Sequence, residues 1–499
     1  MKNMRKIASV LLALVMVFAL AAPVFAAETY SITINNSAEG HTYEAYQIFK
    51  GDLNGSTLSN VQWGASVTNY SGDATAIVEK LDEQYTGEDK LTVEDLLAMI
   101  TLGEEVSATS TQTDGKYVIS GLAAGYYLVK DAYGSLNGTN DAYTQYIVKV
   151  VKDTEAAPKS DVPEVEKKVK DINDSTENEY SAWQDSADHD IGDDVPFQLT
   201  ATLANNVEAY RTYKVVFHDT LTAGLTYNND AVVKFNNEDV TKYFTITCEN
   251  GQLTISCNNV KAFGATNSSQ IVVEYTAKLN ENANIGAAGN PNVVYLEYSN
   301  NPNWDADGDG KPDEPGTPGT PGDETPEEPT GKTPEDKVIV FTFKVVVDKV
   351  DENGAALAGA GFTLFKLDVA TGEYKQIGNE LTGDQMTQFV WTGVDDGDYK
   401  LVESTTPAGY NTREDIYFTI TAEHDILSDN PQLTSLTGGD LFTGNVSTGA
   451  LSTIVINKSG VELPETGGMG TTLFYAFGAI MVLGAAVLLV TKKRMSIAE

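Results

Sequence analysis

The chain has 499 residues, a formal net charge of −38 at pH 7 and two cysteines. At roughly 150 residues per domain, this length corresponds to about three domains. A surface this acidic repels phosphate backbones, which argues against nucleic-acid binding, and two cysteines exclude a disulfide framework.

The first 26 residues are typical of a secretory signal peptide. They begin with three basic residues, Lys2, Arg5 and Lys6. An apolar stretch over 7–22 follows, and Ala26 supplies the small residue after which a signal peptidase cuts. We therefore expect the secreted protein to begin at residue 27.

Residues 27–157 predict a β domain with a helical insertion. Strands are expected at 29–35, 41–50, 116–120, 126–130 and 143–151, where apolar and polar residues alternate. Between them, Asp73 and Thr92 are suited to cap two short helices, and Asp95 completes a capping box with Thr92.

Residues 161–302 predict a β-sandwich. Short β-rich runs recur between turn signals at 195–203, 212–217, 244–248, 253–257, 271–279 and 293–298. Asn250-Gly251 predicts a two-residue hairpin turn. That register places Cys248 near Leu253 and leaves Cys257 beyond disulfide reach.

Residues 303–336 have the composition of a linker, rich in Pro, Gly, Thr and acidic residues. Acids alternate there with glycines as in the first part of a calcium loop, at Asp305, Asp307, Asp309 and Asp313. The position of the closing glutamate holds Gly316, so a solvated acidic linker is favoured and calcium binding stays open.

Residues 337–459 predict a third domain, with strands at 338–350, 361–367, 389–392, 399–403, 416–421 and 452–457. A repeat links it to the first domain. Gly121-x3-Gly125-x-Tyr127 matches Gly393-x3-Gly397-x-Tyr399, and ten residues after each leading glycine stands an acid, Asp131 or Glu403. We expect the two domains to share a sandwich topology.

Three polar residues of the third domain have the parity of core-facing positions. Lys349 shares its strand face with Val345 and Val347, Glu403 follows Leu401, and Asn457 follows Val455. Burying them is costly unless they pair or react. Burial lowers the lysine pKa, which frees an amine, and raises the glutamate pKa, so that its proton can polarise the Asn carboxamide. These are the requirements of a self-made Lys–Asn isopeptide bond.

The surrounding sequence resembles the B-type domain of collagen-binding surface proteins. The matching segments are Lys349-Val350-Asp351, Gly361-Phe362-Thr363-Leu364 and Tyr399-x-Leu401-x-Glu403-x3-Pro407-x-Gly409-Tyr410. The resemblance implies an Ig-like or prealbumin-like β-sandwich in which Lys349 and Asn457 are joined and Glu403 is catalytic. The alternative is a surface lysine on an edge strand with turn-forming Glu and Asn.

The second domain offers a related set, Lys167, Asp219 and Asn292, each in phase with inward-facing apolar residues. This set resembles the A-type isopeptide domain of pilins, with Asp219 as the catalytic acid and Lys167 and Asn292 as the bonded pair. Lys168 and Asn290 are alternatives, and a plain sandwich without a bond is another.

The first domain departs from this pattern. The position in the first domain that is equivalent to Lys349 lies near Thr33, and no lysine is close to it in the sequence. We expect no isopeptide bond there and a satisfied or solvated Asp131.

The junction of the first two domains reads Ala156-Ala157-Pro158-Lys159-Ser160. It resembles the pilin motif, in which a lysine after proline accepts the sortase-bound threonine of the next subunit. The family often has Tyr where Ala157 stands. Lys159 is the expected acceptor, and an ordinary linker lysine is the alternative.

The C-terminus resembles the cell-wall sorting signal of Gram-positive surface proteins. Its parts are Leu463-Pro464-Glu465-Thr466-Gly467, an apolar run at 471–490 expected to span the membrane as a helix, and a basic tail at 491–499 with Lys492-Lys493-Arg494. The resemblance implies that a sortase cuts between Thr466 and Gly467 and passes the threonine carboxyl to an amine. A tail-anchored membrane protein is the alternative.

The four histidines are scattered, and no metal-binding spacing or nucleophile motif accompanies them. We expect no metal, no cofactor and no enzymatic activity beyond self-made isopeptide bonds. The whole chain resembles the SpaA-type, sortase-assembled backbone pilins. This implies sortase, neighbouring pilin subunits and peptidoglycan as partners, and a place in a pilus on the cell surface. The runner-up is a monomeric wall-anchored adhesin that binds host matrix proteins, and the third option is a surface hydrolase.

Overall fold

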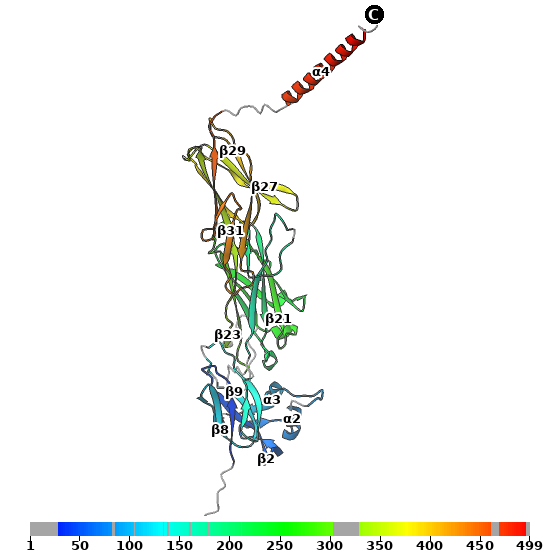
Figure 1. Cartoon of the computed structure of the whole chain (residues 1–499). Helices are drawn as coiled ribbons and strands as arrows, with labels where there is room; N and C mark the ends of the chain where they lie inside the picture. The colour runs from blue at the N-terminus through cyan, green and yellow to red at the C-terminus, as the bar shows by residue number, and fades with distance from the viewer. Residues whose placement is uncertain are drawn as a thin grey trace, which may run out of the picture.

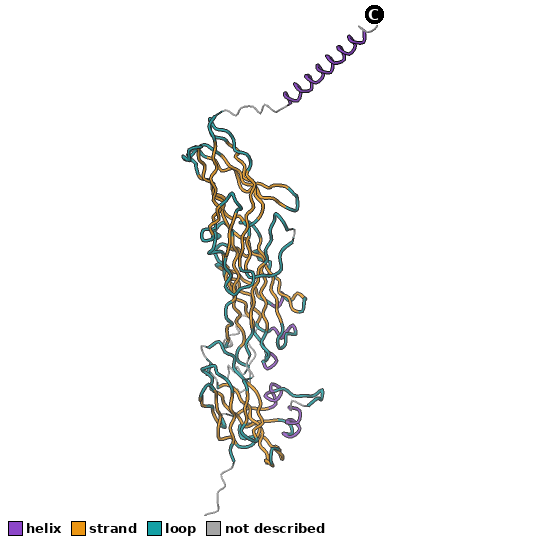
Figure 2. Tube along the Cα trace, in the orientation of Figure 1, coloured by secondary structure: helices purple, strands orange, loops and turns teal. Residues whose placement is uncertain are grey.

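The computed structural model describes residues 28–81, 85–103, 105–132, 134–136, 139–158, 161–177, 179–210, 212–302, 329–460 and 469–495. Three β-sandwich domains follow one another along a rod, and one long helix lies at its C-terminal end (Figure 1). Strands form most of each domain, as Figure 2 shows. The expected mainly-β architecture of tandem sandwiches is confirmed.

The first domain packs two sheets around a core that includes Ile32, Ile119 and Val129. One sheet has the order β11 (Thr154–Ala156), β1 (Tyr30–Ile34), β8 (Lys116–Leu122) and β7 (Thr111–Thr113). The other has the order β10 (Gln145–Val150), β9 (Gly125–Asp131), β2 (Tyr43–Asn54) and β3 (Thr57–Trp63), with β6 (Ala108–Thr109) paired to β2.

The helical insertion of the first domain forms as expected. It contains α2 (Ala74–Leu81), α3 (Val93–Met99) and a small sheet of β4 (Val67–Tyr70) and β5 (Ile100–Leu102). Asp73 Oδ1 accepts a hydrogen bond from the main-chain N–H of Ala76 at 3.0 Å, and Thr92 and Asp95 form the capping box. Ile77 and Leu96 pack against Ile48 of the second sheet.

The second domain is a larger sandwich. One sheet has the order β12 (Glu164–Val169), β14 (Asp194–Thr202), β21 (Gln270–Leu279), β17 (Val232–Phe235) and β18 (Glu238–Asp239), with β16 (Leu225–Tyr227) paired to β21. The other has the order β13 (Ser186–Asp188), β24 (Asp336–Phe341), β22 (Asn290–Ser299), β15 (Val215–Leu221), β20 (Gln252–Cys257) and β19 (Thr245–Glu249), with β23 (Thr330–Lys332) paired to β22. The predicted hairpin register is confirmed, since Cys248 lies opposite Leu253, and both cysteines are free.

The boundary between the second and third domains differs from the prediction. The strand expected over 338–350 is two strands, β24 and β25 (Phe343–Asp351), which belong to different sheets. Val338 and Val340 of β24 lie in the core of the second domain. Ile339 and Phe341, on the other face of β24, lie in the core of the third domain, so residues 338–343 are buried without a gap and the apolar run alone could not reveal the change of sheet. The third domain therefore begins at Phe343.

The third domain repeats the topology of the first. One sheet has the order β28 (Gln388–Val394), β25, β33 (Ala450–Asn457) and β32 (Thr443–Asn445), and the other β27 (Glu373–Thr382), β26 (Gly361–Asp368), β29 (Gly397–Thr405), β30 (Ile416–His424) and β31 (Leu433–Thr437). Strands β28-β25-β33 correspond to β8-β1-β11, and β30-β29-β26-β27 to β10-β9-β2-β3. In both domains the first strand runs parallel to the last.

The sequence repeat forms a turn that a tyrosine hydroxyl stabilises with a hydrogen bond. Gly121 and Gly393 have φ values of 81° and 78°, a left-handed conformation that favours glycine. The Tyr127 hydroxyl donates to the Ala123 carbonyl at 2.9 Å, and the Tyr399 hydroxyl donates to the Asp395 carbonyl at 3.0 Å. The expectation of a shared sandwich topology is confirmed.

The C-terminal helix is α4 (Met469–Met495). Among the described residues, no helix combines the length and hydropathy needed to cross a membrane, so the predicted spanning segment at 471–490 is not confirmed. Several predictions concern residues outside the described ranges: the signal peptide at 1–26, Lys159, the acidic repeat at 305–313 and the motif Leu463–Gly467.

Candidate functional site

The third domain brings Lys349, Glu403 and Asn457 together in its interior. Lys349 lies on the first strand, β25, and Asn457 on the last, β33, which run side by side. Lys349 pairs with Val455 in the ladder, so Asn457, two residues further on, shares its face. Glu403 comes from β29 in the facing sheet, and the exposed fractions of the three residues are 1%, 5% and 1%.

The contacts of this centre leave one polar atom unsatisfied. Asn457 Nδ2 donates to Glu403 Oε1 at 2.6 Å, and Glu403 Oε2 accepts from the main-chain N–H of Arg413 at 2.6 Å. Asn457 Oδ1 is buried without a partner, which costs about 1–3 kcal/mol. Lys349 Nζ donates only to main-chain carbonyls, those of Val350 at 3.1 Å and Val455 at 3.2 Å.

Burial sets the protonation of the lysine. It lowers the pKa of Lys349, while the nearby Glu403 and Asp351 carboxylates act in the opposite direction. A lysine with a lowered pKa is more often an uncharged amine, which is a nucleophile.

The second domain gathers Lys167, Asp219 and Asn292, all fully buried, around the hydroxyl of Tyr275. Lys167 Nζ donates to Asp219 Oδ1 at 2.6 Å and to the Tyr275 hydroxyl at 3.1 Å. That hydroxyl donates to Asp219 Oδ2 at 2.5 Å and accepts from Asn292 Nδ2 at 2.7 Å. Asn292 Oδ1, like its counterpart in the third domain, is buried without a partner.

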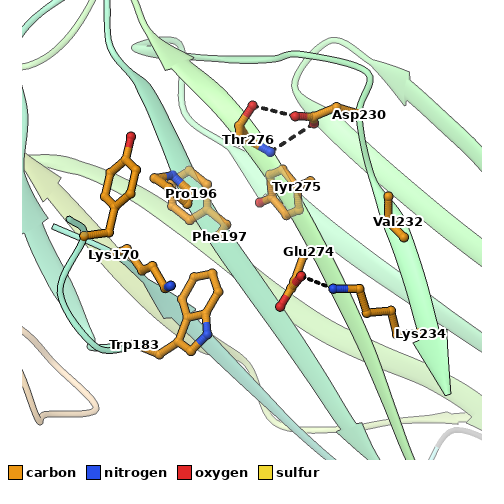
Figure 3. A pocket seen from close by; sticks show the side chains of 11 residues that line it. Lys170, Trp183, Pro196, Phe197, Asp230, Val232, Lys234, Glu274, Tyr275 and Thr276 are labelled. Atoms are coloured by element: carbon orange, nitrogen blue, oxygen red, sulfur yellow. Dashed lines mark hydrogen bonds and ion pairs between the residues drawn. The ribbon is translucent and has the colours of Figure 1, made fainter. Parts of the chain in front are cut away.

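Two aromatic rings cover the amine of this centre. Lys167 Nζ lies 5.4 Å from the ring centroid of Phe197 and 5.5 Å from that of Tyr275. The two rings stack with centroids 5.4 Å apart and line a surface pocket of about 400 Å³, in which Figure 3 shows them side by side. Burial lowers the pKa of Lys167 against the opposing effect of Asp219, and burial together with Asp219 raises the Tyr275 pKa well above its ordinary value.

The contacts favour Lys167 and Asn292 over the alternatives. Lys168 Nζ is partly exposed and pairs with Asp185 at 2.6 Å and Glu166 at 3.1 Å. The Asn290 amide is satisfied, since it accepts from the Asn284 N–H and donates to the carbonyls of Asn284 and Val340.

Sequence reasoning missed Tyr275, although a signal for it existed. Tyr275 alternates with Ile271 and Val273 on the buried face of β21, so a polar hydroxyl at that position must find a partner inside the sandwich. The neighbouring His218 and Asp219 point to opposite faces of β15 and do not form an acid/base pair, because the His218 ring pairs with Glu297 at 2.9 Å while Asp219 is buried.

In the first domain, Asp131 occupies the place of Glu403 and is satisfied. It accepts from the main-chain N–H of Thr144 at 2.7 Å and pairs with His41 Nδ1 at 2.8 Å. Burial raises the pKa of Asp131, and His41 opposes this effect. The sequence did not indicate His41, which stacks on Tyr43 with ring centroids 5.1 Å apart.

A charged seam joins the second and third domains. Lys366 Nζ lies among Asp174 at 3.2 Å, Asp190 at 2.9 Å and Asp395. Beside them, His424 Nε2 lies 3.2 Å from Asp188 and 3.5 Å from Asp171. These acids outnumber the cations.

Protonation reflects the crowding of acids at this seam. Burial and the neighbouring Asp188 raise the pKa of Asp396 to about 8. Asp171 and Asp188 raise the pKa of His424 to about 10 against the effect of its burial. Two groups have ligand atoms within 4.8 Å of one another, as a metal ion requires: Asp171, Asp188 and His424, and Asp174, Asp190, Asp193 and Asp395. Each group unites residues from distant parts of the chain, so no motif signalled it. The Lys366 ammonium pairs with three carboxylates of the second group.

Comparison with known families identifies most of the third domain and the C-terminal segment. Residues 343–430 match the family described as the SpaA prealbumin-like fold domain, and residues 456–496 match the LPXTG cell wall anchor motif. The chain is a cell-wall-anchored surface protein with a SpaA-type domain. The sorting signal expected from the sequence is confirmed.

Similar proteins extend the likeness to the whole rod. The trypsin-resistant surface T6 protein of Streptococcus pyogenes serotype M6 is 24% identical over 400 residues, which cover 67% of this chain and 70% of that protein. The solved T6 backbone pilin of serotype M6 has a TM-score of 0.54 at 19% identity and covers 87% of this chain and 99% of its own. The major pilin SpaD of Corynebacterium diphtheriae has a TM-score of 0.47 at 16% identity, over 87% of this chain and 98% of its own. The likeness to the T6 structure gives this chain the fold of a three-domain backbone pilin.

Proposed function

We propose that this chain is the structural subunit of a covalent surface pilus, polymerised by a sortase and attached at its base to peptidoglycan. The observation that carries the proposal is a cell-wall anchor motif at the end of a rod with the backbone-pilin fold. A sortase thiol attacks the Thr466 carbonyl and releases the Gly467 amine. The Lys159 amine of the next copy then displaces the thiol and forms an amide.

Each of the two buried centres forms an internal isopeptide bond. In the third domain, the uncharged Lys349 amine attacks Cγ of Asn457. Glu403 donates a proton to the amide nitrogen, which leaves as ammonia, and takes up the proton that the attacking amine loses. The contact between the Glu403 carboxyl group and Asn457 Nδ2 supports this role, because it places the acid beside the nitrogen that leaves. The lowered pKa of Lys349 supports its role as nucleophile.

The second centre performs the same condensation between Lys167 and Asn292. Asp219 takes the place of the glutamate, and Tyr275 links its carboxyl group to the Asn292 amide. We assign Tyr275 as a positioning residue, because its hydroxyl contacts the nucleophile, the acid and the amide at once.

The placement of the two bonds suits a fibre under tension. Each joins the first strand of its domain to a late strand, β12 to β22 and β25 to β33. Tension that enters at Lys159 and leaves at Thr466 then crosses each domain through its bond. Residues 168–291 and 350–456 lie outside this path, so these parts of the sandwiches stay folded under load.

The test is assembly in cells that express the matching sortase. The wild-type protein should give an SDS-resistant ladder of multimers, and Lys159→Ala should reduce it to monomer. Lys152→Ala, an exposed lysine seven residues earlier, is the matched control and should keep the ladder. A monomer in all three would favour a wall-anchored adhesin and exclude the pilus subunit.

A further inference from the structure

An apolar surface lies on the outer face of the sheet β28-β25-β33-β32. Ile454 is 63% exposed, Ile456 is 49% exposed and Val390 is 39% exposed. The strand registers place Val390 beside Val346, and Ile456 beside Val350, on this same face, where Asp348 lies beside Ile454. The five apolar residues therefore surround one carboxylate. We call these five residues the β33 face. Exposed β-branched side chains gathered on one sheet of a chain with net charge −38 mark a contact surface.

The same strand has an open edge. One edge of β33 pairs with β25 along its length, whereas β32 pairs with the other edge only at Ala450–Ser452. Among the described residues, no strand covers that second edge over 453–457. Natural proteins usually protect such edges with charges or prolines, and here the edge carries Ile454 and Ile456 instead.

The proposed polymer determines what can reach this surface. Thr466 lies nine positions after Asn457, a distance that an extended chain spans in at most about 32 Å. The proposed joint therefore tethers the next copy within about 32 Å of Asn457, the last residue of β33. Val162 of the incoming copy, three residues beyond its Lys159, is 41% exposed.

We propose that the β33 face and the open edge at 453–457 seat the next copy of the chain, on the surface around its Val162. This inference rests on the proposed covalent joint. The joint makes the contact intramolecular, with an effective concentration in the millimolar range. A contact with a dissociation constant of about 1 mM, too weak to dimerise free monomers, is then substantially occupied in the fibre.

Hydrogen exchange of the wild-type polymer tests the proposal against free Lys159→Ala monomer. The main-chain amides of 453–457 should exchange at least about tenfold more slowly in the polymer. A ladder whose amides at 453–457 exchange as in the monomer would overturn the docking and leave the proposed function intact. Absence of any ladder would instead overturn the proposed function, and this inference with it.

A pair of variants adds a mechanical readout. Ile454→Lys combined with Ile456→Lys should keep the ladder but give fibres with a shorter persistence length in electron micrographs. Tyr417→Lys, at a 56% exposed position of β30 in the opposite sheet, is the control and should leave fibre stiffness unchanged. Equal stiffness in all three fibres would contradict the proposal. The exchange experiment uses wild-type polymer, so it decides the matter even if the double variant fails to fold.

Discussion

Glu403→Ala is the substitution that isolates the chemistry of the third domain. It removes the acid that contacts the Asn457 amide, so the Lys349–Asn457 bond should not form. Each bond releases one ammonia, so wild-type secreted protein with two bonds should weigh about 34 Da less than its sequence, and the variant about 17 Da less.

The loss of stability follows from the length of chain that the bond closes. A cross-link between Lys349 and Asn457 closes a loop of roughly 110 residues, and the chain-entropy estimate for that length is about 5 kcal/mol. At about 3–5 °C per kcal/mol for a domain of this size, the unfolding midpoint of the third domain should fall by about 15–25 °C.

The assay is intact-mass spectrometry followed by calorimetry of the same sample. Glu380→Ala, whose exposed carboxylate accepts from the hydroxyls of Ser404 and Thr405, is the matched control and should keep the full mass deficit. A wild-type mass equal to that of the unmodified sequence, or a Glu403→Ala variant with the full deficit, would refute the assignment.

Three further predictions concern the second domain and the seam. Tyr275→Phe should slow or abolish formation of the Lys167–Asn292 bond, so that the protein is about 17 Da heavier than wild type. The control Tyr227→Phe should keep the wild-type mass. Equal masses for wild type and Tyr275→Phe would show that Tyr275 has no role in forming the bond. Lys366→Ala leaves Asp190 and the buried Asp395 without their cation and should lower the free energy of unfolding by about 3–5 kcal/mol. The control Lys375→Ala, at an exposed lysine of another ion pair, should lower it by less than about 1 kcal/mol. Similar melting curves for the two variants would contradict this prediction. His424 has its pKa raised from 6.5 to about 10 and Asp396 from 3.8 to about 8, so the folded state holds more protons and the melting temperature should fall between pH 6 and 10. His424→Gln should reduce this pH dependence of the melting temperature. A wild-type melting temperature that stays constant or rises with pH would contradict the raised pKa values at the seam.

Many features of this structure could be predicted from the sequence, because they depend on residues only a few positions apart. The capping box at Thr92 and Asp95, the hairpin register of Cys248 and the inward parity of Lys349 and Lys167 follow from spacings of a few residues. The alternation of buried and exposed residues along each strand also predicted that the members of both centres are buried, since a buried face repeats every second residue.

Features that depend on which distant strands meet could not be predicted in the same way. The division between β24 and β25 leaves no polar gap in the sequence, because β24 is buried on both faces, one in the core of each domain, and β25 continues in the core of the third. The seam unites residues such as Asp190, Lys366 and His424, which are spread over more than two hundred positions. Tyr275 was within reach of sequence reasoning, but a tyrosine on a buried face is usually read as core packing alone.

The covalent joint between copies is the central claim, and peptide sequencing of the SDS-resistant polymer tests it most directly. After tryptic digestion, tandem mass spectrometry should find one branched peptide in which the Thr466 carboxyl is linked to Nζ of Lys159 and Gly467 is absent. A polymer whose branch lies at another lysine would contradict the joint, and cells that hold only single copies with intact internal bonds would contradict the pilus.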